Sequence, residues 1–248
     1  MLPGMIGRLW IAALLGLLAL VAPAQAQTAA RRTTAVVELY TSQGCMQCGR
    51  ANRLLGVFSR ERGVIALTFP VGIWDYLGWR DTLAQPEFSE RQRAYANAMH
   101  VRAMSTPHLI FNGVSHNSGL NWDDARALLD AAMATPPPDG APEVSIVRLR
   151  SGRVRVTLSG AEHGAGAEIW LVSYNPSPIT VYVASPLYGN RTVTDYNVVS
   201  AIERVETWSG EPLWFEHNQC LPECVVLVQR PGPGAILGAA TTQSAPWP

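Results

Sequence analysis

The sequence predicts an α/β domain with a mixed sheet and helices on both faces, followed by a β-rich antiparallel domain. Residues 36–69 contain an apolar run, an amphipathic stretch and a second apolar run, which is the pattern of a strand–helix–strand unit. A proline-rich segment at 135–141 follows the last helical pattern and predicts a stiff linker. After this linker the spacing of apolar residues changes from 3.6 to 2, which is typical of strands.

Composition agrees with two domains and excludes some partners. The chain has 248 residues, 48% of them apolar and 15% charged, which is enough apolar material for one large or two small cores. We expect domains at 27–134 and 142–248. Lysine plus arginine equals aspartate plus glutamate at 19 each, so no basic field is present to attract nucleic acid or an anionic membrane.

Residues 1–26 have the pattern of a secretory signal peptide. Arg8 precedes an apolar run at 9–22, and Ala24-Gln25-Ala26 resembles a cleavage site. The run is shorter than the roughly 20 residues of a spanning helix, although an uncleaved anchor is the alternative. We therefore expect a periplasmic or secreted protein, free of the membrane after cleavage, in a compartment where disulfides persist.

The expected elements follow from these periodicities. In the first domain we expect strands at 36–40, 64–69, 108–111 and 114–116, and helices that run from 48 to 63, from 86 and from 121. Asn112-Gly113 indicates a type I′ hairpin turn. In the second domain we expect an antiparallel sandwich or open sheet packed on the first domain, with strands at 144–149, 154–158, 168–174, 180–184, 192–206 and 225–229.

Cys45 and Cys48 follow the first strand directly, across a turn at 41–44. At a helix N-terminus, free N–H groups and the helix dipole would stabilise a Cys45 thiolate, which makes Cys45 the expected nucleophile. Cys48, one turn into the helix on its buried side, is placed to resolve a mixed disulfide. A purely structural disulfide or an inert reduced pair remains the alternative.

Cys220 and Cys224 are separated by three residues. A structural disulfide across this short loop is the first interpretation in an exported protein. A second redox pair that exchanges electrons with the first is the alternative.

The segment from 70 to 81 is unusually aromatic. Trp74, Asp75, Tyr76, Trp79 and Asp81 combine rigid aromatic rings with carboxylates, a composition that suits the wall of a substrate-binding groove. The alternative is that the same rings fill the interface between the two domains.

We expect no cofactor, but a metal is the alternative use of the cysteines. Soft thiolate ligands suit Cu(I), so Cys45 and Cys48 with His108 form a candidate copper site, to which His100, His116 or Met46 would be further ligands. Zinc held by all four cysteines is a second alternative.

The order of these elements resembles that of a thioredoxin-like module. In more detail, the chain resembles a bacterial secreted family known as domain of unknown function 1223. It departs from that family's pattern after the second cysteine, at 49–52, and before Trp74, at Pro70 and Gly72. The segments that carry the resemblance are 37–48, Trp74-Asp75-Tyr76-Leu77-Gly78-Trp79, Arg91-Gln92-x-Ala94-Tyr95, Thr106-Pro107, Val226-Leu227-Val228-Gln229 and Gly232-Pro233-Gly234.

The resemblance implies roles for three further residues. Glu38 resembles a buried carboxylate that moves the proton of the resolving cysteine, with a pKa that burial should raise. The alternative is a Glu38 side chain bonded to backbone, Arg50 or Arg53. Thr106-Pro107 resembles a cis-proline turn that faces the cysteines and offers its backbone to an extended substrate.

These expectations define two functions. The first is an exported thiol-disulfide oxidoreductase that acts on protein thiols and disulfides or on a redox partner. The alternative is a binding module without turnover, either a copper carrier or a protein-docking scaffold.

Overall fold

The computed structural model describes residues 34–160, 166–218 and 220–243. The predicted signal peptide therefore lies outside the described residues. The first half contains β1 (Ala35–Thr41), α1 (Cys48–Phe58), β2 (Val64–Pro70), η1 (Asp75–Leu77), α2 (Pro86–Ala98), β3 (His108–Phe111), β4 (Ser115–Asn117) and α3 (Trp122–Ala134). The second half contains β5 (Glu143–Arg148), β6 (Val154–Ser159), β7 (Ala167–Asn175), β8 (Ile179–Ser185), β9 (Gly189–Asp195), β10 (Val198–Trp208), β11 (Leu213–His217), β12 (Glu223–Gln229) and β13 (Ile236–Thr241).

Strand β1 lies inside the largest sheet of the described residues, whose order is β13-β12-β7-β10-β2-β1-β3-β4. It pairs in parallel with β2 and antiparallel with β3, and all seven of its residues are buried. A strand with neighbours on both sides and cover on both faces must be largely apolar, which explains the run of apolar residues in this segment.

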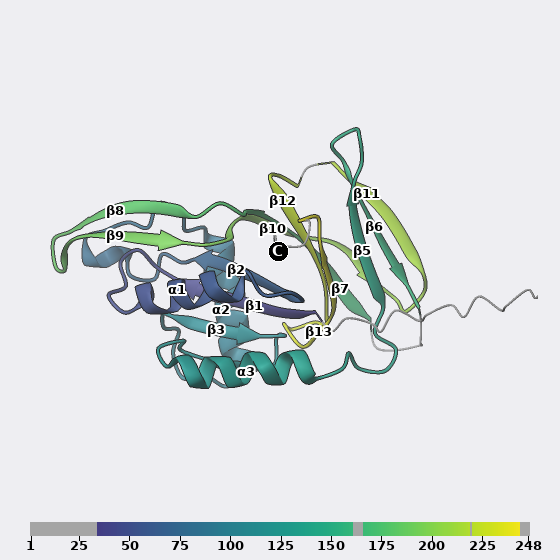
Figure 1. Cartoon of the computed structure of the whole chain (residues 1–248), viewed down its shortest axis with the longest axis horizontal. Coiled ribbons are helices and arrows are strands. Elements are labelled where there is room, and N and C mark those ends of the chain that lie inside the picture. The colour runs from purple at the N-terminus through teal and green to yellow at the C-terminus, as the bar shows by residue number, and fades with distance from the viewer. Residues whose placement is uncertain (1–33, 161–165, 219, 244–248) are drawn as a thin grey trace, which may run out of the picture. The chain divides into compact units, whose positions relative to one another are not determined.

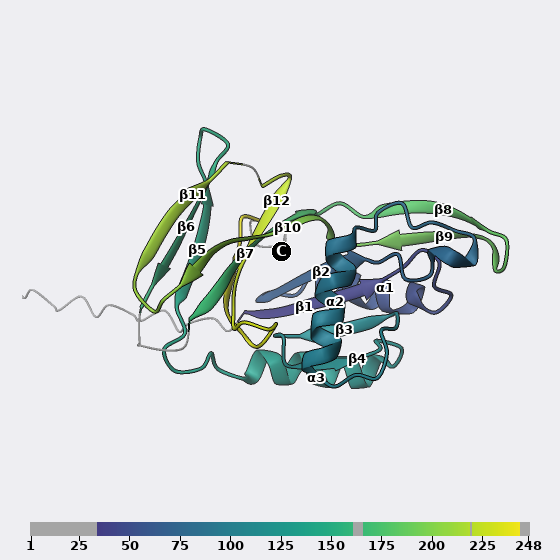
Figure 2. The ribbon, with the colours of Figure 1, turned by 180° about the vertical axis from the view of Figure 1, so that it is seen from behind.

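Helices cover β1 from both sides. Because side chains alternate along a strand, Val37 and Leu39 pack against α1 and α3, whereas Val36 and Tyr40 pack on the α2 side. Figure 1 shows the face that carries α1 and α3, and Figure 2 shows α2 crossing the opposite face. Mixed pairing and helices on both faces agree with the α/β class that the sequence predicts.

Strands from beyond the proline segment extend the same sheet. Strand β10 pairs in parallel with β2 at Val198 and Thr68, and β7, β12 and β13 follow outward from β10. The Asn197 side chain donates to the carbonyl oxygen of Ala66 at 2.8 Å, next to this pairing. The domain boundary at 135–141 stays a prediction; the structure adds that the main sheet includes strands from both sides of it.

A smaller sheet packs on the outer strands of the main sheet, which come from the second half of the chain. Strands β5, β6 and β11 form a three-stranded sheet, and the expected hairpin between β5 and β6 is confirmed, with Arg148 opposite Val154. Its apolar side faces β7 and β12, which makes a local sandwich. The core between them contains Ile146, Val154, Val156, Leu158, Ile169, Leu171, Val226 and Val228.

Strands β8 and β9 form a separate two-stranded hairpin, which we call the arm (179–195). Figure 1 shows the arm beside α1. The expected single strand at 192–206 is wrong: β9 ends at Asp195, Asn197 has a positive φ of 47°, and β10 begins at Val198. This break turns the chain from the arm into the main sheet.

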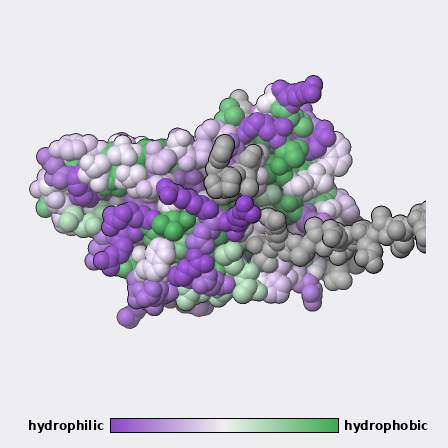
Figure 3. All heavy atoms as spheres, in the orientation of Figure 1, coloured by the Kyte–Doolittle hydropathy of each residue, from purple (hydrophilic) through white to green (hydrophobic). Residues whose placement is uncertain are grey.

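The outer surface of the described residues is mixed. On the face that carries α1, hydrophobic residues form separate patches among hydrophilic ones (Figure 3). None of the helices in the described ranges is long and apolar enough to cross a membrane.

Candidate redox site

Cys45 and Cys48 form a disulfide, with Cα atoms 5.5 Å apart. The turn between β1 and α1 is held by Ser42, whose carbonyl accepts from the Cys45 N–H at 3.0 Å and whose Oγ accepts from the Gly44 N–H at 3.2 Å. Helix α1 begins at Cys48, as the sequence predicts, and Cys45 lies in the turn that leads into its N-terminus. Cys48 is only 1% exposed, whereas Cys45 is partly exposed, so Cys45 is the more accessible cysteine of the pair.

The segment before β3 faces Cys45. The carbonyl oxygen of Thr106 lies 3.4 Å from Cys45 Sγ, and the Thr106–Pro107 peptide bond is cis, as the resemblance implies. Nε1 of Trp74 donates to Oγ1 of Thr106 at 2.7 Å. Three segments distant in sequence therefore meet at Cys45.

The aromatic segment borders the cysteine turn. Nε1 of Trp79 donates to the Gln43 side chain at 3.0 Å, and Asp75 accepts from the Asp81 N–H at 3.0 Å. Tyr76 is 75% exposed. At Gly78 the segment also meets the arm, because a Cβ there would lie 3.2 Å from Pro186. The structure thus places Trp74 and Trp79 against residues that border Cys45, and Gly78 of the same segment against an element of the second half.

A buried polar cluster lies behind the turn. Oδ1 of Asn52 accepts from Oγ1 of Thr41 at 2.8 Å, and Nδ2 of Asn52 donates to Oδ1 of Asp195 at 2.5 Å. Burial raises the pKa of Asp195 to about 7; the charge of Asp81 acts in the same direction, and the Asn52 hydrogen bond opposes both. Burial also raises the pKa of Asp81, although its carboxylate accepts the Gln43 N–H at 2.7 Å.

The sequence interpretation missed Asn52 and Asp195. The sequence does contain a signal for the break at Asp195: Asp195-Tyr196-Asn197 interrupt the strand pattern expected at 192–206. Asparagine and aspartate are depleted in strands and favour turns, so this interruption indicates the end of a strand.

Glu38 is buried on the other face of the sheet, in an ion pair with α2. Its Oε2 accepts from Nε of Arg91 at 2.7 Å, and its Oε1 accepts from Nη2 of Arg91 at 2.9 Å. The hydroxyls of Tyr95 and Tyr40 donate to Oε1 and Oε2 at 2.6 and 2.9 Å. Gln229 accepts from Arg91 at 3.0 Å, so β1, α2 and β12 share one network.

The expected rise in the Glu38 pKa is wrong. Burial alone would raise this pKa, but the charge and hydrogen bonds of Arg91, with the hydroxyls of Tyr95 and Tyr40, lower it below its usual value. The partner is Arg91 and neither Arg50 nor Arg53. The network that holds the Glu38 carboxylate lies on the α2 side, whereas Cys48 belongs to α1, so we do not assign Glu38 a role in proton transfer.

His108 also lies on the α2 side of the sheet. Its ring is 6.4 Å from that of Tyr40 and 5.0 Å from that of His116, and burial lowers its pKa to about 4. The structure does not bring His108 to the cysteine pair. No group of three or more His, Cys, Asp or Glu side chains that could hold a metal occurs in the described ranges.

The second cysteine pair forms the expected disulfide between Cys220 and Cys224. Both residues are at least 99% buried. Arg148 of β5 donates to the carbonyl oxygens of Cys220 and Pro222 at 3.1 and 2.8 Å, which fixes the loop against the smaller sheet. A buried, fixed pair is poorly accessible to another protein, in contrast to Cys45.

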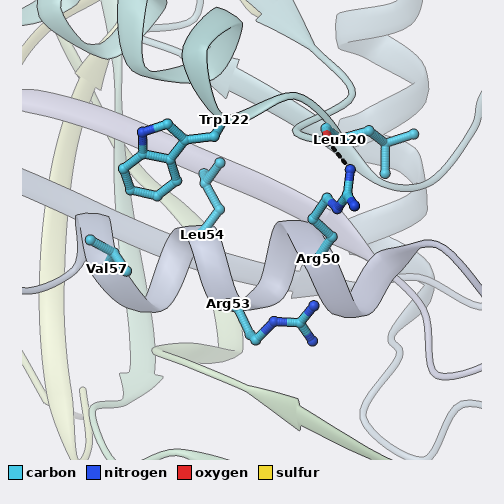
Figure 4. A pocket seen from close by; sticks show the side chains of 6 residues that line it. All are labelled: Arg50, Arg53, Leu54, Val57, Leu120 and Trp122. Atoms are coloured by element: carbon cyan, nitrogen blue, oxygen red, sulfur yellow. Dashed lines mark hydrogen bonds between the residues drawn. The ribbon is translucent and has the colours of Figure 1, made fainter.

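A pocket of about 280 Å³ lies on the outer side of α1 (Figure 4). Arg50 donates to the carbonyl oxygen of Leu120 at 2.9 Å across it. None of the residues that the sequence predicts for the site lines this pocket. Its walls are formed by Arg50, Arg53, Leu54, Val57, Leu120 and Trp122.

The fold and site define a mixed α/β protein with an accessible disulfide at the start of a helix. A family model described as "Protein of unknown function (DUF1223)" matches residues 36–229, and the chain belongs to this family. Among curated proteins, none matches the sequence. The crystal structure of protein AGR_C_4864 from Agrobacterium tumefaciens is similar, with 29% identity and a TM-score of 0.70 over 84% of this chain and 92% of that one.

Proposed function

We propose that this protein is an exported thiol-disulfide oxidoreductase of thioredoxin-like fold that acts on protein thiols and disulfides. The observation that carries the proposal is the asymmetry of the Cys45–Cys48 pair: a partly exposed sulfur in a turn is bonded to a buried sulfur that begins a helix. Nucleophilic attack needs one accessible sulfur, and resolution needs a second sulfur within bonding reach. The element order and the Thr106 carbonyl opposite Cys45 support the same assignment.

In the reductive direction the Cys45 thiolate attacks a substrate disulfide. A Cys45–substrate disulfide forms, and the other substrate sulfur leaves as a thiolate. Cys48 then loses its proton and attacks Cys45, which restores the Cys45–Cys48 disulfide and releases the second substrate thiolate. Two electrons pass from the pair to the substrate; the reverse sequence oxidises substrate thiols.

Export is part of the proposal. Two disulfides in the described residues suit an oxidising compartment, and the signal-like residues 1–26 would direct the chain there.

Reduction of insulin and refolding of a scrambled disulfide protein by the purified mature chain test the proposal. We expect Cys45→Ser to abolish both activities and Cys48→Ser to accumulate a mixed disulfide on Cys45. The matched control is the double variant Cys220→Ala/Cys224→Ala, which should retain exchange. A wild-type chain that exchanges with neither protein nor small-molecule disulfides would refute the proposal.

A further inference from the structure

The pocket on the outer side of α1 has an apolar end that is open to solvent. Trp122 lies next to Leu54 in Figure 4, and Val57 lies beside them. Leu54 is 4% exposed and forms the floor, whereas Trp122 and Val57 are 45% and 46% exposed and form the walls. The Phe58 ring packs against that of Trp122, with 5.8 Å between the ring centres. A rigid indole with part of its surface uncovered is suited to contact with another flat ring.

The opposite end of the pocket is cationic. Figure 4 shows the guanidinium groups of Arg50 and Arg53 away from the indole of Trp122. One donor of Arg50 is used by the carbonyl oxygen of Leu120, at 2.9 Å, which fixes this side chain at the edge of the pocket. Within the described ranges Arg53 has neither an ion pair nor a hydrogen bond. Its donors are therefore available to a ligand.

The charge of this end is not compensated by the helix that carries it. Helix α1 contains two arginines and no acidic residue. Side chains three positions apart are neighbours on a helix surface, so the two guanidinium groups repel each other. Glu61, Asp123 and Asp124 are close in sequence to the walls, but none of them lines the pocket, and Glu61 pairs with Arg126. An anion bound at this end would relieve the repulsion.

We infer that this pocket binds a small aromatic carboxylate, with its ring against Trp122 and its carboxylate at Arg50 and Arg53. An inorganic anion would use only the cationic end, and a neutral arene only the apolar end, whereas an aromatic acid uses both. The planar fork of a guanidinium matches the two oxygens of a carboxylate. The volume of about 280 Å³ is near the lower limit of roughly 300 Å³ for small-molecule sites, which suits a single ring with a short side chain. No cysteine lines the pocket, so the inference is independent of the proposed function.

The test is a titration of the wild-type protein with phenylpropionate, followed by the nuclear magnetic resonance signals of the backbone amides and the indole N–H groups. We expect the indole signal of Trp122 and the amides of 53–57 to shift and to saturate together. The indole of Trp214, which is 66% exposed on β11, should not move. Phenylpropionamide has the same shape without the charge and should bind at least tenfold more weakly. Equal affinities for the acid and the amide, or no saturable shift at Trp122, would overturn the inference.

Exposed side chains at both ends of the pocket allow variants that leave the core intact. Arg53→Gln removes the charge and should weaken phenylpropionate binding at least fivefold, whereas Arg93→Gln, at an exposed arginine of α2, is the matched control and should bind as wild type does. Trp122→Ala should lose saturable binding, and Trp214→Ala should keep it. Wild-type affinity in both Arg53→Gln and Trp122→Ala would contradict the assignment of the two ends.

The same chemistry is present in a free aromatic acid and in the C-terminus of a peptide that ends in phenylalanine. A tripeptide of two glycines and a C-terminal phenylalanine distinguishes these sources in the same titration. Tighter binding of the tripeptide than of phenylpropionate assigns the pocket to a peptide C-terminus, and weaker binding assigns it to a free acid. Failure of both to shift Trp122 refutes the site. The titration needs no disulfide exchange, so its result and that of the exchange assays can be judged separately.

Discussion

Glu38 and Asp195 are both buried carboxyl groups, on opposite sides of one sheet, and they differ in their partners. Glu38 contacts the guanidinium of Arg91 and two tyrosine hydroxyls, and its pKa is lowered. Asp195 contacts the neutral amide of Asn52, and its pKa is raised to about 7. Equal burial thus accompanies opposite pKa shifts, because the charge of the partner decides whether the desolvation penalty is offset.

The two faces of the sheet therefore differ in how their buried carboxyl groups respond to pH. On the α2 side the ion pair of Glu38 and Arg91 joins β1, α2 and β12. Because the pKa of Glu38 is lowered, this pair stays charged at neutral pH. On the α1 side, Asp195 and Asp81 both have raised pKa values, and both contact elements that carry or precede the cysteines. Groups that titrate are gathered behind the disulfide, whereas the fixed ion pair is on the other face.

The largest expected effect comes from breaking the α2-side pair. Arg91→Met leaves Glu38 buried without its cation, which should lower the free energy of unfolding by about 4 kcal/mol. Urea unfolding at neutral pH measures this loss. The double variant Glu38→Gln/Arg91→Met should recover most of it, and a loss in Arg91→Met below about 1 kcal/mol would contradict a buried, charged pair.

The second prediction concerns stability against pH on the α1 side. The folded-state pKa of Asp195, about 7, lies above its ordinary value of 3.8, so the folded protein binds this proton more tightly than the unfolded chain. The resulting stabilisation is complete below about pH 4 and is lost as pH rises through about 7, in total about 4 kcal/mol. Asp195→Asn should remove this decline; parallel unfolding curves for variant and wild type would show that Asp195 titrates normally.

Two glycines of α1 test the contact between the helix and Tyr196, the residue that follows the arm. A Cβ at Gly56 would lie 2.8 Å from the Tyr196 ring, whereas a Cβ at Gly49 would meet only Nη1 of Arg53, at 3.7 Å. Gly56→Ala should therefore cost about 2 kcal/mol of unfolding free energy. Gly49→Ala is the matched control and should gain up to about 1 kcal/mol from helix propensity. Equal thermal unfolding temperatures of the two variants would contradict the contact between Gly56 and the Tyr196 ring.

The smallest expected effect is at Tyr40, whose hydroxyl is one of several donors to Glu38. Tyr40→Phe should cost about 1 kcal/mol in chemical unfolding, because Arg91 and Tyr95 still satisfy the carboxylate. The network should keep Glu38 ionised in the variant. A loss as large as that of Arg91→Met would mean that the hydroxyl, and not the guanidinium, holds the charge.

Local features of the fold were predictable because they depend on residues close in sequence. The expected starts of α2 at Pro86 and of α3 next to Asn121 are confirmed, and the Asn121 side chain caps α3 by accepting from the Asp123 N–H. Asn112 and Gly113 both have positive φ, as the turn signal indicates. The position of the cysteines between β1 and α1 was predictable too, because it depends only on neighbouring residues.

Partners distant in sequence were not predictable. Glu38 and Arg91 both belong to segments that the sequence singles out, but they are 53 positions apart, and spacing alone cannot choose one arginine among many. The pairing of β10 with β2 depends on a bond from the Thr68 N–H to the carbonyl of Asn197, which no periodicity encodes. The break in the strand pattern at Asp195 marks the end of a strand, but the contact of Asp195 with Asn52, 143 positions away, cannot be read from that pattern.

The bond between Asn52 and Asp195 joins positions 143 apart, and this separation governs the order of assembly. Helix α1 can form as soon as its own segment is available, but the arm that covers one side of it comes from residues 179–195. Contacts of such long range form late and slowly during folding. Until they form, α1 lacks the cover that Asp195 gives to Asn52 and Tyr196 gives to Gly56, so this side of the helix becomes buried only after the arm has folded onto it.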